Sequence, residues 1–75
     1  MLIDTSGLLC MVDKAERHHQ AASSAFSSMH RGILHNYVVA EFVALANVRG
    51  IPRQTSLMFA AQACVHPNIH FRWVD

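Results

Sequence analysis

Three short apolar runs, separated by two longer stretches with helical patterning, limit the folds open to this chain. The runs are Met1–Ile3, Gly32–His35 and Ile69–Val74. Short apolar runs beside turn or capping residues are typical of buried strands. The third run alternates, with its apolar residues, Trp73 included, expected on one face. Strands that alternate with helices predict a parallel sheet with right-handed crossovers. We therefore expect an α/β fold with a three-stranded parallel sheet and about four helices.

The stretch between the first two strands predicts two helices. Thr5 or Ser6 is placed to cap a short helix over Leu8–Val12, so that the first strand leads directly into a helix. Asp13–Glu16 is close to a capping box, in which a cap residue is followed by glutamate at the third helical position. This pattern predicts that a second helix begins there and ends near Ser28.

The stretch between the second and third strands predicts two more helices. Asn36 is placed to cap a helix over Tyr37–Val48, which is apolar almost all round and is therefore expected to be buried on most sides. Gly50 and Pro52 are the usual stop signals beyond a helix end. The fourth helix is expected to run from about Gln54 to Val65.

The composition fits one small domain that packs against something else. A chain of 75 residues with 52% hydrophobic and 15% charged residues is too apolar for disorder and rather apolar for a small monomer. The net charge of +1 gives no basic patch of the kind that marks a nucleic-acid binder. No apolar run approaches the roughly 18 residues of a membrane helix, and Asp4 interrupts any signal-peptide pattern. A cytoplasmic protein without a membrane partner is expected.

The two cysteines, Cys10 and Cys64, lie in apolar helical stretches. Free cysteine is commonly a small buried hydrophobic residue, and we favour that interpretation over a disulfide.

Asp4 is the first candidate for a functional residue. It ends the first predicted strand, and ligands of open parallel sheets bind just beyond the carboxyl ends of the strands. The alternative is that Asp4 only caps the helix that follows. Sequence alone leaves both interpretations open.

Glu41 is the second candidate, because it is a carboxylate in an otherwise apolar helical stretch. The residues three and four positions away on either side are apolar or aromatic. A buried charge needs a cation, a hydrogen-bond partner or a shifted pKa. We favour a metal site, and the alternative is a structural ion pair with Arg49 or Arg53.

Adjacent parallel strands would bring Asp4 and Glu41 to the same edge of the sheet. Clustered carboxylates suit hard divalent cations such as Mg²⁺ or Mn²⁺, which can activate water and stabilise charge in phosphodiester cleavage. Two carboxylates are few for a two-metal site.

The histidines and arginines add weaker candidates. His18 and His19 are adjacent and point in different directions on a helix, and no histidine spacing favours a zinc site. His35 lies beside the proposed site by topology and is a candidate for substrate contact. Arg49 and Arg53 flank a turn. Two interpretations remain open: they bind phosphate, or they are solvated surface charges.

The order and spacing of these motifs resemble a PIN-domain nuclease of the VapC toxin type. Leu2–Ser6 resembles the opening of that family, Asp13–Ala22 its second-helix segment, and Asn36–Glu41 its third-helix motif. The resemblance covers essentially all 75 residues and continues through Arg49–Gly50. It implies a Mg²⁺- or Mn²⁺-dependent endoribonuclease of a toxin–antitoxin system, usually a dimer that a partner antitoxin neutralises.

In the family, the metal site uses an acidic residue at the first strand, the third-helix glutamate and further aspartates later in the domain. Asp4 and Glu41 match the first two positions, and no role is carried over to Asp75. A complete PIN domain is nearly twice as long, so we interpret residues 1–75 as its N-terminal half. The first strand then becomes an exposed edge, which predicts a homo-oligomer, such as a dimer, with strand pairing or an exchanged element.

Two hypotheses follow from the resemblance. The chain is either a metal-dependent ribonuclease whose incomplete site a second chain completes, or a catalytically inactive, truncated PIN-like protein that folds by self-association.

Overall fold

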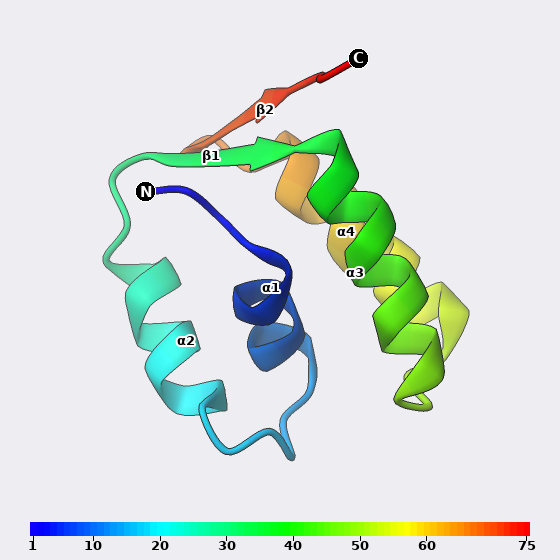
Figure 1. Cartoon of the computed structure of the whole chain (residues 1–75). Helices are drawn as coiled ribbons and strands as arrows, with labels where there is room; N and C mark the ends of the chain where they lie inside the picture. The colour runs from blue at the N-terminus through cyan, green and yellow to red at the C-terminus, as the bar shows by residue number, and fades with distance from the viewer.

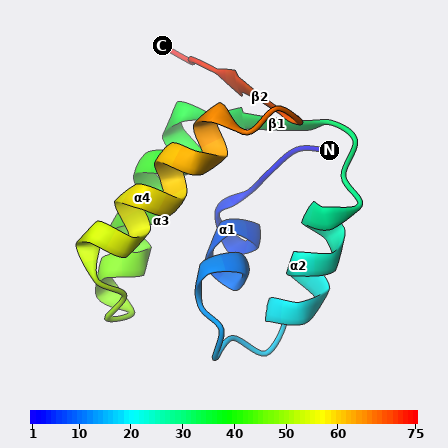
Figure 2. The ribbon, with the colours of Figure 1, turned by 180° about the vertical axis from the view of Figure 1, so that it is seen from behind.

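The computed structural model describes residues 1–75, and its four helices all lie on the same side of the strands (Figures 1 and 2). In chain order the elements are α1 (Thr5–Val12), α2 (His19–Ser27), β1 (Gly32–His35), α3 (Asn36–Val48), α4 (Arg53–Val65) and β2 (Ile69–Arg72). Helices α1 and α2 connect the N-terminal segment to β1, and α3 and α4 connect β1 to β2. The predicted order of strands and helices is therefore largely confirmed.

The sheet has two strands, so the prediction of three is wrong. β1 and β2 are parallel, in a register that pairs Gly32 with Ile69. The N-terminal segment runs parallel to β1 but makes only one isolated bridge, between Leu2 and Ile33. Two hydrogen bonds hold it there: the N–H of Ile3 donates to the carbonyl of Ile33 (2.8 Å), and the N–H of Ile33 donates to the carbonyl of Met1 (2.7 Å). The segment is too short for a strand because the chain turns into α1 directly after it.

The core lies between the helices and the inner face of the sheet. Ten buried hydrophobic residues form it: Ile3, Leu8, Leu9, Met29, Leu34, Phe42, Ala46, Ala60, Ala63 and Ile69. Gly32 brings β1 close to this core, since a Cβ there would lie 2.6 Å from the Sδ atom of Met29. No helix is long and apolar enough to cross a membrane.

The expected start of the second helix at Asp13 is wrong. Asp13 ends α1, with its backbone N–H donating to the carbonyl of Leu9, and its Oδ1 accepts from the N–H of Ala15 (3.1 Å). A short acidic side chain that bonds its own following backbone favours a turn over a helix start. Helix α2 therefore begins at His19.

The expected cap at Asn36 is also wrong, because His35 is the N-cap and Asn36 is the first residue of α3. The Asn36 amide instead pairs with the backbone of Val74: its Nδ2 donates to the Val74 carbonyl (3.1 Å), and its Oδ1 accepts from the Val74 N–H (2.6 Å). This side chain therefore ties the segment after β2 to the start of α3.

Two predictions about the apolar segments are wrong. Helix α3 was expected to be buried on most sides, but only Phe42 and Ala46 are buried, and Val48 is 82% exposed. Trp73 was expected to share one face of a strand with Ile69, but β2 ends at Arg72, and Trp73 beyond it is 73% exposed.

Candidate metal centre

Asp4 occupies the junction between the N-terminal segment and α1. It is the N-cap of α1, with extended backbone angles, and its Oδ1 accepts a hydrogen bond from the N–H of Gly7 (2.7 Å). The expectation that Thr5 or Ser6 caps this helix is therefore wrong, and the capping interpretation of Asp4 is confirmed. A cap uses one carboxylate oxygen, and the side chain remains exposed, so capping does not prevent a second role.

Glu41 lies in the second turn of α3. Its apolar sequence neighbours predicted that it would be buried, but its side chain is exposed. Its Oε1 accepts a hydrogen bond of 2.6 Å from the Oγ1 of Thr5. The alternative of an ion pair with Arg49 or Arg53 is wrong, because the one salt bridge joins Arg49 to Glu16 (2.9 Å). A hydroxyl of α1, not a cation, is therefore the partner of the Glu41 carboxylate.

Thr5 links the two candidate acids. It follows Asp4 directly, it is only 8% exposed, and its hydroxyl reaches from α1 to α3. The packing of α1 against α3 thus brings the carboxylate of Glu41 to the helix end that carries Asp4. From the sequence, Thr5 was expected only to cap the helix. Its position directly after Asp4 could also have indicated that its hydroxyl contacts a second residue of the site.

The remaining acids do not join this pair. Asp75 accepts from the indole Nε1 of Trp73 (3.1 Å), Glu16 pairs with Arg49, and Asp13 bonds the backbone of Ala15. No group of three or more histidine, cysteine, aspartate or glutamate residues is arranged to hold a metal ion. Among the acids, Asp4 and Glu41 are therefore the two that the packing of α1 against α3 brings toward each other.

The histidines are dispersed. His35 ends β1 at the N-terminus of α3, and its Nδ1 is buried without a hydrogen-bond partner. His19 bonds the carbonyl of Cys10 through Nδ1 (2.6 Å), and the Nδ1 of His66 accepts from the N–H of Asn68 (3.0 Å). These three histidines therefore make separate local contacts.

Both cysteines are free and partly buried, as the sequence analysis favoured. Burial raises the pKa of the Cys64 thiol, which keeps it protonated and a poor nucleophile.

The fold is similar to that of a bacterial toxin. No protein-family model and no curated protein matches the sequence. The crystal structure of Mycobacterium tuberculosis VapC20, a sarcin–ricin loop cleaving toxin, superposes with a TM-score of 0.83 at 19% sequence identity. The match covers 99% of this chain and 56% of VapC20, so the chain spans little more than half the length of that toxin. The chain therefore has a VapC-like PIN fold.

Proposed function

We propose that the chain carries part of the metal site of a VapC-type ribonuclease, with Asp4 and Glu41 as metal ligands. The observation that best supports this proposal is the hydrogen bond of 2.6 Å from Thr5 to Glu41, which holds the α3 carboxylate beside the end of α1 that carries Asp4. RNA is the substrate in this proposal, and an antitoxin is the neutralising partner, as the likeness to a toxin suggests.

The donor set suits Mg²⁺ or Mn²⁺. Both carboxylates are exposed, and each makes a hydrogen bond through only one of its oxygens, Asp4 through Oδ1 and Glu41 through Oε1. Mg²⁺ commonly binds through one or two carboxylates and keeps several waters, so two acids suffice for one ion. Further oxygen ligands would come from water, from RNA or from a second chain. A bound ion supplies Lewis acidity and a more acidic water for phosphodiester hydrolysis.

The chain's own residues prepare this site. Gly7 fixes one oxygen of Asp4 by donating its N–H, and Thr5 fixes one oxygen of Glu41 by donating its hydroxyl. The remaining oxygens, Oδ2 of Asp4 and Oε2 of Glu41, stay available to a cation. Thr5 is thus a positioning residue, because it acts on the site through Glu41.

RNA cleavage with Mg²⁺ or Mn²⁺ tests the proposal. Asp4→Asn and Glu41→Gln are each expected to abolish cleavage, because a neutral amide oxygen binds a divalent cation much more weakly than a charged carboxylate does, and the site has only two carboxylates. Asp75→Asn is the matched control, since Asp75 bonds only Trp73 and should leave cleavage unchanged. Cleavage that survives both substitutions would contradict the proposal.

A second candidate function is that of an inactive PIN-like protein that folds by self-association. The exposed apolar surface favours it: Leu2 is 66% exposed, Val48 82%, Val65 79% and Trp73 73%. The backbone N–H and carbonyl of Leu2 also have no backbone partner, so the N-terminal segment presents an open sheet edge.

Leu2→Lys tests this candidate, because a charge on an edge strand disfavours pairing with another chain. Sedimentation is expected to show a dimer for the wild type and a monomer for this variant. Leu57→Lys is the control, since Leu57 is exposed on α4, away from the edge. A wild-type monomer, or a dimer that tolerates Leu2→Lys but not Leu57→Lys, would rule out edge pairing.

A further inference from the structure

A polar hollow lies where the turn between α1 and α2 meets the first turns of α2. Its volume is about 430 Å³, and no hydrophobic residue lines it. The lining residues are Lys14, Glu16, Arg17, His19, Gln20 and Ser23. The hollow contains neither of the proposed metal ligands, Asp4 and Glu41.

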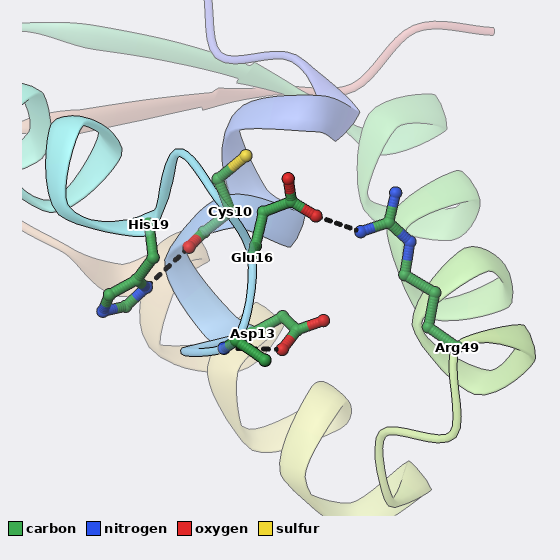
Figure 3. A network of polar contacts seen from close by, with 6 residues as sticks. Cys10, Asp13, Glu16, His19 and Arg49 are labelled. Atoms are coloured by element: carbon green, nitrogen blue, oxygen red, sulfur yellow. Dashed lines mark hydrogen bonds and ion pairs between the residues drawn. The ribbon is translucent and has the colours of Figure 1, made fainter.

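Three contacts fix the backbone of this turn (Figure 3). Asp13 accepts a hydrogen bond from the N–H of Ala15 (3.1 Å), and Nδ1 of His19 bonds the Cys10 carbonyl (2.6 Å). Glu16 forms a salt bridge to Arg49, the residue that caps the C-terminal end of α3 (2.9 Å). The His19 contact therefore attaches the turn to α1, the Asp13 contact closes the turn, and the Glu16 contact attaches it to the end of α3. A fixed turn presents its side chains at defined positions, which lowers the entropic cost of binding a ligand.

The charge of the hollow is positive. Glu16 is the only acid among its lining residues, and Arg49 neutralises it. Lys14 and Arg17 form no salt bridge, so both cations are available to an anion. Gln20 and Ser23 add neutral hydrogen-bond donors. Together these groups match a phosphate, which accepts several hydrogen bonds and favours lysine and arginine.

His19 and Ser23 also face the hollow. Because the Cys10 carbonyl can only accept, Nδ1 of His19 carries the proton in their hydrogen bond of 2.6 Å. Nε2 of His19 lies 3.5 Å from the hydroxyl of Ser23.

We infer that this hollow binds a phosphate of an RNA backbone, as a docking subsite separate from the metal ligands. The inference rests on the proposed function for its choice of RNA. Helix α1 has 8 residues, so its two ends lie about 12 Å apart. Asp4 caps the start of this helix and the turn that carries the hollow follows its other end, so a single RNA strand is long enough to span both sites. Contacts to phosphate position a strand without reading its sequence.

Binding of a labelled single-stranded RNA 12-mer, measured by fluorescence anisotropy in EDTA, tests the inference without the metal site. The double variant Lys14→Gln/Arg17→Gln is expected to bind at least about tenfold more weakly at low salt. The slope of log K against log salt concentration should become shallower by about 0.7, since one neutralised phosphate on a single strand contributes about that much. Arg31→Gln/Arg53→Gln removes the same charge elsewhere and should retain the wild-type slope. An equal loss in both double variants would overturn the inference, because it would reflect net charge alone.

A titration with inorganic phosphate separates the possible sources of the ligand. Phosphate that competes with the 12-mer only at millimolar concentration supports an RNA subsite, whereas tight phosphate binding with no RNA binding overturns it. Asp4→Asn should not weaken binding in EDTA, because it removes a negative charge and leaves the hollow intact. Loss of metal-dependent cleavage in that variant, with RNA binding intact, would separate the two proposals.

Discussion

Phe42→Ala is expected to remove a large part of the protein's free energy of unfolding, about 3–5 kcal/mol. Phe42 is completely buried, and its ring packs on that of Phe59 with centroids 5.7 Å apart, which joins α3 to α4. Truncating a buried phenylalanine costs about 3–5 kcal/mol. A domain of 75 residues has a free energy of unfolding of only about 4–11 kcal/mol. Urea denaturation followed by circular dichroism measures the loss.

Val48→Ala on the same helix is the control, since Val48 is 82% exposed and its truncation should change the free energy of unfolding by less than about 0.5 kcal/mol. Equal effects of the two substitutions would mean that α3 is buried on its other side, for example against a second chain.

Thr5→Val is expected to lower the affinity for Mn²⁺ by about tenfold or more. The substitution keeps the shape of a buried side chain but removes the hydroxyl that holds Glu41. Losing a residue that orients a metal ligand typically costs 10–100-fold in affinity. Isothermal titration with Mn²⁺ measures the change.

Thr5→Ser provides the test of rescue. Serine keeps the hydroxyl and should restore most of the affinity, although it loses a buried methyl group. If Thr5→Ser and Thr5→Val bind Mn²⁺ equally weakly, then Thr5 contributes packing and does not orient Glu41.

The strands show what local patterns can predict. β1 has the predicted bounds, Gly32–His35, because glycine sets its start and the cap of α3 sets its end. Met1–Ile3 has a strand-like sequence but forms a single bridge. The chain turns into α1 directly afterwards, so too few residues lie beside β1 to form a ladder. A local pattern does not contain that information.

The helix boundaries show where local patterns compete. Asp13 is equally suited to capping a helix and to closing a turn. Its backbone N–H donates to the Leu9 carbonyl at the end of α1, and its side chain accepts from the N–H of Ala15, so it forms the turn. Asn36 has a side chain suited to a helix cap, but its amide hydrogen-bonds with the backbone of Val74, 38 residues later in the chain. Such distant partners cannot be inferred from neighbouring residues.

The same limit applies to the candidate site. Asp4 and Glu41 were found because each carboxylate is unusual in its local sequence. Their connection through Thr5 spans 36 residues and depends on how α1 packs against α3. Glu41 was expected to be buried but is exposed for the same reason. An apolar helical sequence predicts burial, but which of its faces are covered depends on the elements that pack against it.

The most direct test of a shared metal site is paramagnetic broadening of backbone amide signals by Mn²⁺ in NMR spectra. Substoichiometric Mn²⁺ is expected to broaden the signals of Asp4, Thr5 and Glu41 first, because both carboxylates hold the same ion. In Asp4→Asn and in Glu41→Gln, the broadening should be lost at both segments together. Broadening that persists around Glu41 in Asp4→Asn, or that centres on other residues, would contradict a site built from these two acids.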